Sequence, residues 1–231
     1  MSDLVKYAIN DGIAVLTLSN GKVNALTPEL IAELNDGLDQ AQAAGAIVIV
    51  TGQPGIFSGG YDLKVMMKGP ENAIALVAAG SALSRRMLAH PQPIIAACNG
   101  HAVAKGAFLL LASDYRLGVA GEFTIGLNEV QIGMTMHHVG ILLARDRLSP
   151  AVFQRSVINA EMFDPQGAMV AGFLDRVVAA DQLMPTALEV ARQMKKLNPV
   201  AHRATKLKAR KALLEALDGA IEADKKASVV G

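Results

Sequence analysis

The apolar positions along the chain follow two spacings, one typical of buried strands and one typical of amphipathic helices. Short apolar runs rich in β-branched residues predict strands, and the run at 47–50 is typical of a strand covered on both faces. Apolar residues that recur every three or four positions behind Thr27 and Pro28 predict a helix with a capping residue and a proline in its first turn. The predicted strands are 13–18, 47–50, 94–97, 115–119 and 177–178, and further helices are predicted to begin near 70, 107, 150 and 165. This alternation predicts a fold of the α/β class.

The last part of the chain is helical in pattern from about 182 to 227, with one break at Asn198 and Pro199. We therefore divide the chain into an α/β core, residues 1–190, and a C-terminal helical region, residues 191–231. An apolar stripe on this tail must be buried, either against the chain's own core or between subunits. The stripe consists of Leu207, Leu214, Leu217 and Ile221.

Composition and charge exclude several classes of protein. The chain has 231 residues, of which 52% are hydrophobic, and this excludes extensive disorder. Its formal net charge of +1 gives no electrostatic reason to expect nucleic acid or a membrane surface as a partner. The single cysteine, Cys98, cannot form a disulfide within the chain, and neither a signal peptide nor an apolar run of membrane-spanning length is present. We expect a cytoplasmic globular protein.

Two glycine-rich turns each follow an apolar strand. One spans 57–63, Phe-Ser-Gly-Gly-Tyr-Asp-Leu, and the other spans 99–108, Asn-Gly-His-Ala-Val-Ala-Lys-Gly-Ala-Phe. Glycine lets the backbone turn sharply between a strand and a helix and leaves amide N–H groups pointing outward. Two such turns side by side would offer two N–H donors to one oxygen atom, which is an oxyanion hole. Each turn alone can equally be an ordinary tight turn.

A third segment, residues 126–134, places one carboxyl group, that of Glu129, among apolar neighbours. A carboxyl group in an apolar pocket has a raised pKa and can transfer protons near neutral pH. The alternative is a surface glutamate at the start of a helix, where the helix dipole favours negative charge.

Taken together and in this order, the three segments resemble those of the crotonase (enoyl-CoA hydratase/isomerase) superfamily, and the resemblance extends from Val15 through the helical tail. It implies a core built as a ββα superhelix and a C-terminal region that forms trimers, which often pair into hexamers. It also implies acyl-CoA thioester substrates and neither a metal ion nor a redox cofactor.

The resemblance assigns the oxyanion hole to the main-chain N–H groups of Tyr61 and Lys105. The family has three glycines where this chain has 104–106, Ala-Lys-Gly, and a lysine is penalised if its position requires a positive φ. The Lys105 ammonium group can point into the pocket or, as we expect, to solvent.

The resemblance also separates two reactions. Hydratases of the superfamily use two glutamates around a water molecule, and their positions fall on Phe108 and Glu129 here. The Δ3,Δ2-enoyl-CoA isomerases use one glutamate, at the Glu129 position, which takes a proton from C2 and returns it at C4. We therefore predict an isomerase. The alternatives are an enoyl-CoA hydratase, a non-catalytic acyl-CoA-binding oligomer and a hydrolase that uses a histidine.

The remaining predicted site residues surround the acyl group and the CoA moiety. The predicted substrate pocket is lined by Phe108, Met134, His137 and His138, where the two histidines can also be structural. The segment 22–26 resembles the one that borders the nucleotide in the family. A basic cluster on the tail suits the phosphates of the nucleotide, although it can equally be a solvated helix face. The cluster consists of Arg203, Lys206, Lys208, Arg210 and Lys211. The predicted CoA-binding residues are Lys22, Asn24, Ala25 and Lys206.

Overall fold

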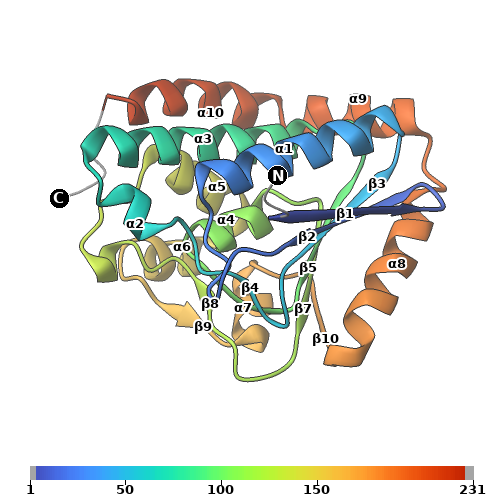
Figure 1. Cartoon of the computed structure of the whole chain (residues 1–231), viewed down its shortest axis with the longest axis horizontal. Coiled ribbons are helices and arrows are strands. Elements are labelled where there is room, and N and C mark those ends of the chain that lie inside the picture. Colours follow the sequence, from blue (N-terminus) through green and yellow to red (C-terminus); the bar gives the residue numbers. More distant parts are fainter. Residues whose placement is uncertain (1–3, 227–231) are drawn as a thin grey trace.

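Two β-sheets form the framework of the structure, a computed structural model that describes residues 4–226 (Figure 1). The larger sheet is parallel except for its first strand, which forms an antiparallel hairpin with the second. Its strands, in spatial order, are β1 (Val5–Asn10), β2 (Ile13–Leu18), β3 (Ile47–Thr51), β5 (Ile94–Cys98), β7 (Tyr115–Val119) and β10 (Arg176–Val178). The smaller sheet contains, in spatial order, β4 (Gly55–Ser58), β6 (Gly100–Val103), β8 (Ile125–Gly126) and β9 (Met162–Phe163).

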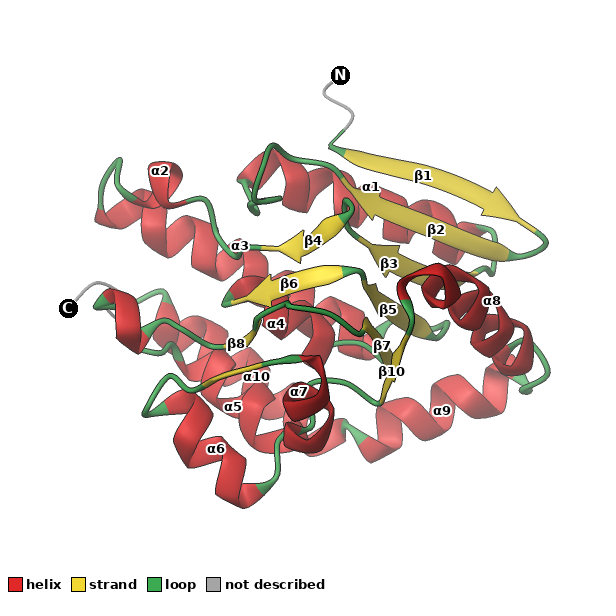
Figure 2. Ribbon diagram, turned by 90° about the horizontal axis from the view of Figure 1, so that it is seen from below, coloured by secondary structure: helices red, strands yellow, loops and turns green. Residues whose placement is uncertain are grey.

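The chain alternates between the two sheets. Strands β3, β5 and β7 of the larger sheet are each followed by a strand of the smaller sheet and then by helical structure. Figure 2 shows β4 and β6 lying next to each other at the side of the larger sheet. This repeated order is the ββα superhelix that the resemblance implies.

Helices cover both faces of the larger sheet (Figure 1). The helices are α1 (Pro28–Ala43), α2 (Leu63–Met66), α3 (Pro70–Ala89), α4 (Lys105–Leu111), α5 (His138–Arg147), α6 (Pro150–Val157), α7 (Pro165–Ala171), α8 (Leu183–Met194), α9 (Pro199–Ala209) and α10 (Lys211–Asp224). Helix α1 packs on β1–β3, and α8 packs on β3, β5 and β7 from the other side. Two short 3-10 turns, η1 (Val130–Ile132) and η2 (Ala180–Gln182), complete the helical structure of the described residues.

Many of the predicted elements occur at the predicted places. Strands β2 and β7 have the predicted bounds, and Thr27 caps α1, where its Oγ1 accepts a hydrogen bond from the Leu30 N–H at 3.2 Å. The elements that were not predicted from the sequence are β1, β4, β6, β8, β9, α2 and α5. The break at Arg210, which separates α9 from α10, was not predicted either. The ends of the two predicted regions, residues 1–3 and 227–231, lie outside the described residues.

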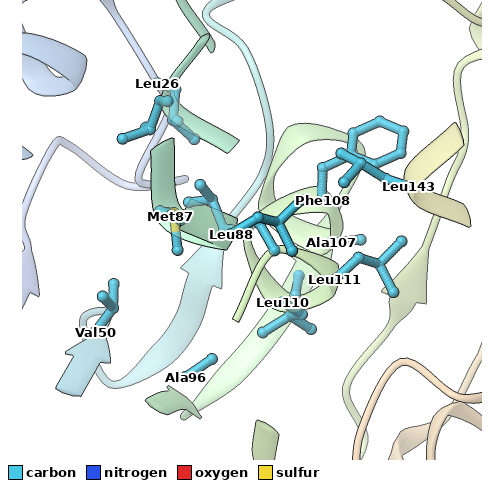
Figure 3. Packing of buried hydrophobic residues seen from close by; sticks show 14 of the residues in the cluster. Leu26, Val50, Met87, Leu88, Ala96, Ala107, Phe108, Leu110, Leu111 and Leu143 are labelled. Carbon is cyan, nitrogen blue, oxygen red and sulfur yellow. The ribbon is translucent and has the colours of Figure 1, made fainter. Parts of the chain in front are cut away.

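Helix α4 lies inside the main core, because each of its residues is buried. Figure 3 shows its apolar side chains among those of α3, β5 and α5; the labelled residues include Met87, Leu88, Ala96, Ala107, Phe108, Leu110, Leu111 and Leu143. Protein interiors are close-packed, so this surrounding fixes the position of α4 and of the turn that precedes it.

The tail packs on the chain's own core. Helix α10 contacts α3 and α5, and the side chains of Leu214 and Leu217 are buried there. The apolar stripe was expected to be buried either against the chain's own core or between subunits. Burial against the core is confirmed for these two residues, and trimer formation stays a prediction. Within residues 4–226 no helix is long and apolar enough to cross a membrane, and the cytoplasmic location stays a prediction.

Candidate active site

Three neighbouring strands of the smaller sheet bring the three predicted segments together. Strands β4, β6 and β8 are parallel to one another, so their carboxyl ends lie at one edge of the sheet. The turn with Tyr61 follows β4, the turn with Lys105 follows β6, and the segment with Glu129 follows β8. The topology therefore places one residue of each segment at a common edge.

The two glycine-rich turns touch. Gly60 has a φ of 99°, and a Cβ atom on it would lie 2.9 Å from the Ala104 Cβ and 3.4 Å from the Lys105 nitrogen. A Cβ on Gly106 would lie 2.3 Å from the Ser58 carbonyl oxygen. Both positions therefore require glycine, one for its φ and both for the close approach of the backbones.

The N–H groups of Tyr61 and Lys105 are both available to a ligand. The Leu26 N–H donates to the Gly60 carbonyl at 2.8 Å, and the Asp62 N–H donates to the Leu26 carbonyl at 3.0 Å. These bonds flank Tyr61 and turn its own N–H to the opposite side. Lys105 begins α4, so its N–H has no acceptor within the helix. Neither N–H donates a hydrogen bond in the described part of the chain.

The strained backbone position lies next to Lys105 rather than at it. Ala104 has a φ of 51°, whereas Lys105 has entered the helix. The penalty that the sequence analysis considered for lysine therefore falls on alanine, whose short side chain still disfavours such a φ.

Glu129 is buried, and this excludes the alternative of a surface glutamate at a helix start. Its side chain lines a cavity of about 110 Å³ together with Tyr61, Ala104 and His137. Its Oε2 has no hydrogen-bond partner, and burial raises the pKa of the carboxyl group to about 7. Such a carboxyl group is populated in both protonation states at neutral pH, as a proton carrier requires.

The predicted pocket residues lie in three different settings. Met134 lines the cavity, and so does His137, whose pKa is lowered by burial, so that its ring is neutral at neutral pH. Phe108 is fully buried behind it, with the two ring centres 5.3 Å apart in an edge-to-face arrangement. His138 was predicted for the pocket, but its side chain is 59% exposed and its Nδ1 lies 2.7 Å from Asp224 Oδ1. It faces α10 rather than the cavity, because adjacent residues at a helix start point in different directions.

The side chain of Lys105 does not point to solvent, contrary to our expectation. It is 1% exposed, and its Nζ donates to the Gly80 carbonyl at 2.6 Å and to Ser84 Oγ, both on α3. Burial lowers the pKa of the amine to about 7.

The loop predicted to bind CoA is held by one of its own residues. Asn24 is buried with a φ of 51°; its Nδ2 donates to the Phe57 carbonyl at 2.8 Å, and its Oδ1 accepts from the Asn20 N–H at 2.8 Å. The Asn24 side chain thus supports the loop, which corrects its predicted role as a CoA ligand. Lys22 is exposed and Ala25 is half-buried, and their contact with CoA stays a prediction.

Lys206 was also predicted to contact CoA, but its side chain binds groups within the chain. Its buried ammonium group lies 2.7 Å from Asp114 Oδ2, 3.0 Å from the His90 carbonyl oxygen and 3.2 Å from the Gln92 carbonyl oxygen. An ammonium group has three donors, and all three are used here, so none remains for a phosphate.

Asp224 of α10 is a residue of this region that the sequence analysis missed. Its Oδ1 accepts from the His138 N–H at 2.8 Å and its Oδ2 from the Val139 N–H at 3.1 Å. It therefore caps the start of α5 next to His137. No local pattern could have indicated this contact, because the partners are more than 80 positions apart. Among the described residues, no group of three or more His, Cys, Asp or Glu side chains is arranged to hold a metal ion.

Neighbouring turns with two available N–H groups beside a buried carboxyl group, on a ββα superhelix, define a crotonase-type protein. The family model of enoyl-CoA hydratase/isomerase matches residues 8–229, and the chain belongs to this family. A similar solved structure is the crystal structure of an enoyl-CoA hydratase/isomerase family protein from Pseudomonas syringae. Its sequence is 67% identical to this chain, and the TM-score of the two structures is 0.97. The match covers 98% of this chain and 99% of that one.

Two curated relatives carry names of different reactions. Human mitochondrial enoyl-CoA delta isomerase 1 is 29% identical over 96% of this chain and 75% of its own length. Carnitinyl-CoA dehydratase of Escherichia coli K12 is 29% identical over 89% of this chain and 80% of its own. The chain is thus an enzyme of the enoyl-CoA isomerase and hydratase kind, and these relatives alone do not select the reaction.

Proposed function

We propose that the chain is a Δ3,Δ2-enoyl-CoA isomerase with Glu129 as its proton carrier. The observation that carries this proposal is the cavity, in which Glu129 is the one carboxyl group among the described lining residues. The position that the resemblance assigns to the second glutamate of hydratases is occupied by the buried side chain of Phe108.

In the proposed reaction, the Glu129 carboxylate takes a proton from C2 of a 3-enoyl thioester. The electrons of the C–H bond move into the C2–C1 bond, and negative charge develops on the thioester oxygen. The N–H groups of Tyr61 and Lys105 hold this oxygen, and Glu129 then returns the proton at C4, which leaves a 2-enoyl thioester. A positioned acid/base group contributes about 10²–10⁴-fold to the rate, and one oxyanion donor about 10²–10³-fold.

A single carboxyl group suits this shift better than it suits hydration. The same proton is removed and returned, so one group with a pKa of about 7 can perform both steps. Hydration needs one group to activate water and another to deliver a proton to C2. The apolar side chains of Met66, Val77, Ile132 and Met134 around the cavity also disfavour an ordered water molecule.

The proposed chemistry uses only residues of the chain and requires no metal ion or redox cofactor. We also infer from the resemblance that the enzyme works as a homotrimer or as a hexamer built from two trimers. Light scattering of the purified protein would give three or six times the monomer mass, and a monomer would contradict this inference.

The test of the proposed function is incubation with 3-enoyl-CoA and, separately, with 2-enoyl-CoA. We expect the double bond of the first to shift, and we expect Glu129→Gln to lower kcat by about 10²–10⁴-fold while acyl-CoA binding remains. Glu122→Gln, which changes an exposed carboxyl group nearby in the sequence, is the matched control and should leave kcat unchanged. Unchanged turnover in Glu129→Gln would contradict the proposal and favour a non-catalytic acyl-CoA-binding oligomer.

Enoyl-CoA hydration is the second candidate, because His137 offers another polar group in the same cavity. Its neutral ring could accept a proton from water, which would supply the second group that hydration needs. Hydration of 2-enoyl-CoA that is lost in both Glu129→Gln and His137→Phe, without any shift of the double bond, would replace the isomerase proposal with this one.

A further inference from the structure

Lys105 carries a buried amine for which the proposed reaction has no use. Its side chain is 1% exposed, and its two hydrogen-bond partners, the Gly80 carbonyl and the Ser84 hydroxyl, are both neutral. No ion pair in the described part of the chain includes this residue. A buried charge without a partner of opposite sign is costly for a folded protein.

The amine belongs to one of the two residues that provide the proposed oxyanion donors and lies near the ring of the other. One donor is the main-chain N–H of Lys105 itself, and the other belongs to Tyr61, whose ring centre is 6.0 Å from the Lys105 Nζ. Lys105 and the rest of α4 are buried. Charges interact over several ångströms in such surroundings, since water does not screen them.

We propose that the Lys105 ammonium group stabilises the thioester enolate by its charge, in addition to the two main-chain N–H groups. This inference rests on the oxyanion hole of the proposed function. In this proposal the negative charge that pairs with the ammonium group is that of the enolate oxygen. This charge exists only while the substrate is ionised, so the free protein contains no partner for the ammonium group among its described residues.

Protonation of Lys105 and formation of the enolate reinforce each other. Burial lowers the pKa of the amine to about 7, so a neutral fraction exists in the resting enzyme, and a nearby anion favours the protonated form. The other titratable groups in this region are Tyr61 on the neighbouring turn, Glu129 and His137 on the cavity wall, and Asp224 on α10. Variants of Lys105 are therefore compared with the wild type over the same pH range, so that these groups titrate alongside the ligand in every protein.

A purely structural role for Lys105 is the alternative, since its side chain ties the start of α4 to α3. Lys105→Met keeps the apolar stem and removes the charge and both hydrogen bonds. Lys105→Gln removes the charge but keeps a donor for the Gly80 carbonyl or Ser84. Ser84→Ala keeps the charge and removes one hydrogen bond, so it is the matched control.

The experiment titrates bound acetoacetyl-CoA, a 3-ketoacyl thioester whose enolate absorbs in the near ultraviolet. We expect Lys105→Met and Lys105→Gln to raise the apparent pKa of the bound ligand by about one to two pH units, equivalent to about 10- to 100-fold weaker binding of the enolate. Their affinity for butyryl-CoA, which stays un-ionised, should change less than about twofold, and Ser84→Ala should leave the titration unchanged.

An equal loss of affinity for both ligands in the two Lys105 variants would overturn the proposal and leave the structural role. An unchanged titration in Lys105→Gln would also overturn it. Neither ligand undergoes the double-bond shift, so failure of the proposed isomerase activity, which the turnover assay detects, is distinguishable from failure of this inference.

Discussion

Burial keeps the carboxyl group of Glu129 protonatable near neutral pH. Its Oε2 accepts no hydrogen bond within the described part of the chain, and burial raises the pKa to about 7. The ionised form is therefore less stable in the folded protein than in the unfolded chain, where the group has its usual pKa of 4.5. The ionised Glu129 thus lowers the free energy of unfolding at the pH at which it acts as the proposed base.

Glu129→Gln should consequently make the protein more stable at neutral and alkaline pH. Below pH 4.5 the carboxyl group is protonated in both states, and the two proteins should have similar free energies of unfolding. As the pH rises from 4.5 to 7 the unfolded chain loses its proton first, so wild type loses up to about 3 kcal/mol relative to the variant. Urea unfolding at pH 4 and pH 8 measures this difference. The same difference at both pH values would contradict it, and Glu122→Gln should show no such pH dependence.

Some properties of single residues can be predicted from the sequence, and others cannot. The resemblance of the three segments to the family implied that Tyr61, Lys105 and Glu129 belong to one site. The structure gives the physical reason why the segments come together, because they follow neighbouring parallel strands. The direction of the Lys105 side chain was not predictable, since it depends on Gly80 and Ser84, which lie on a helix more than 20 positions earlier.

At the scale of elements, α5 depends on α10. No side chain within α5 or at its start caps the helix, and the carboxylate of Asp224 accepts from its first N–H groups instead. His137, immediately before this helix, lines the cavity. The tail helix therefore sets the position of one wall of the candidate site.

Asp224→Ala should lower the free energy of unfolding by about 1–2 kcal/mol, because the N–H groups of His138 and Val139 lose their acceptor. It should also raise KM for acyl-CoA, since the wall that contains His137 is loosened. Chemical denaturation and steady-state kinetics test both effects. Asp218→Ala, on the same helix, removes an exposed pair with Arg85 and should cost less than about 1 kcal/mol. Equal effects of the two substitutions would argue against the cap.

The missed elements share a physical reason. Strand β6 has four residues and obtains its place by pairing between β4 and β8. Helix α5 lacks the local cap and proline that reveal α1 and α7 in the sequence. Patterns reveal elements that are specified locally, whereas contacts distant in sequence define the others.

At the scale of the whole molecule, a buried ionic cluster joins the tail to the larger sheet. Asp114 accepts from the Ile94 N–H at 2.7 Å, at the start of β5, and its carboxylate lies 2.7 Å from the Lys206 Nζ and 2.8 Å from an Arg210 guanidinium nitrogen. The basic cluster that the sequence suggested for phosphate binding is thus partly used to hold the molecule together.

Lys206→Ala should lower the free energy of unfolding by about 2–3 kcal/mol, because Asp114 loses one of its two cationic partners in a buried site. KM for acyl-CoA should stay unchanged in the folded protein. Lys208→Ala, an exposed neighbour on α9, is the control and should change neither quantity. A large rise in KM for the Lys206 variant without loss of stability would restore its predicted role in CoA binding.

Both proposed oxyanion donors are main-chain N–H groups, and every amino acid except proline provides such a group. The side chains at positions 61 and 105 are therefore free to change during evolution without deleting either donor, provided that the backbone keeps its course at Gly60 and Ala104. A phenol and an amine occupy these places here. The fold can thus keep both main-chain donors while the charge of the side chains at positions 61 and 105 varies.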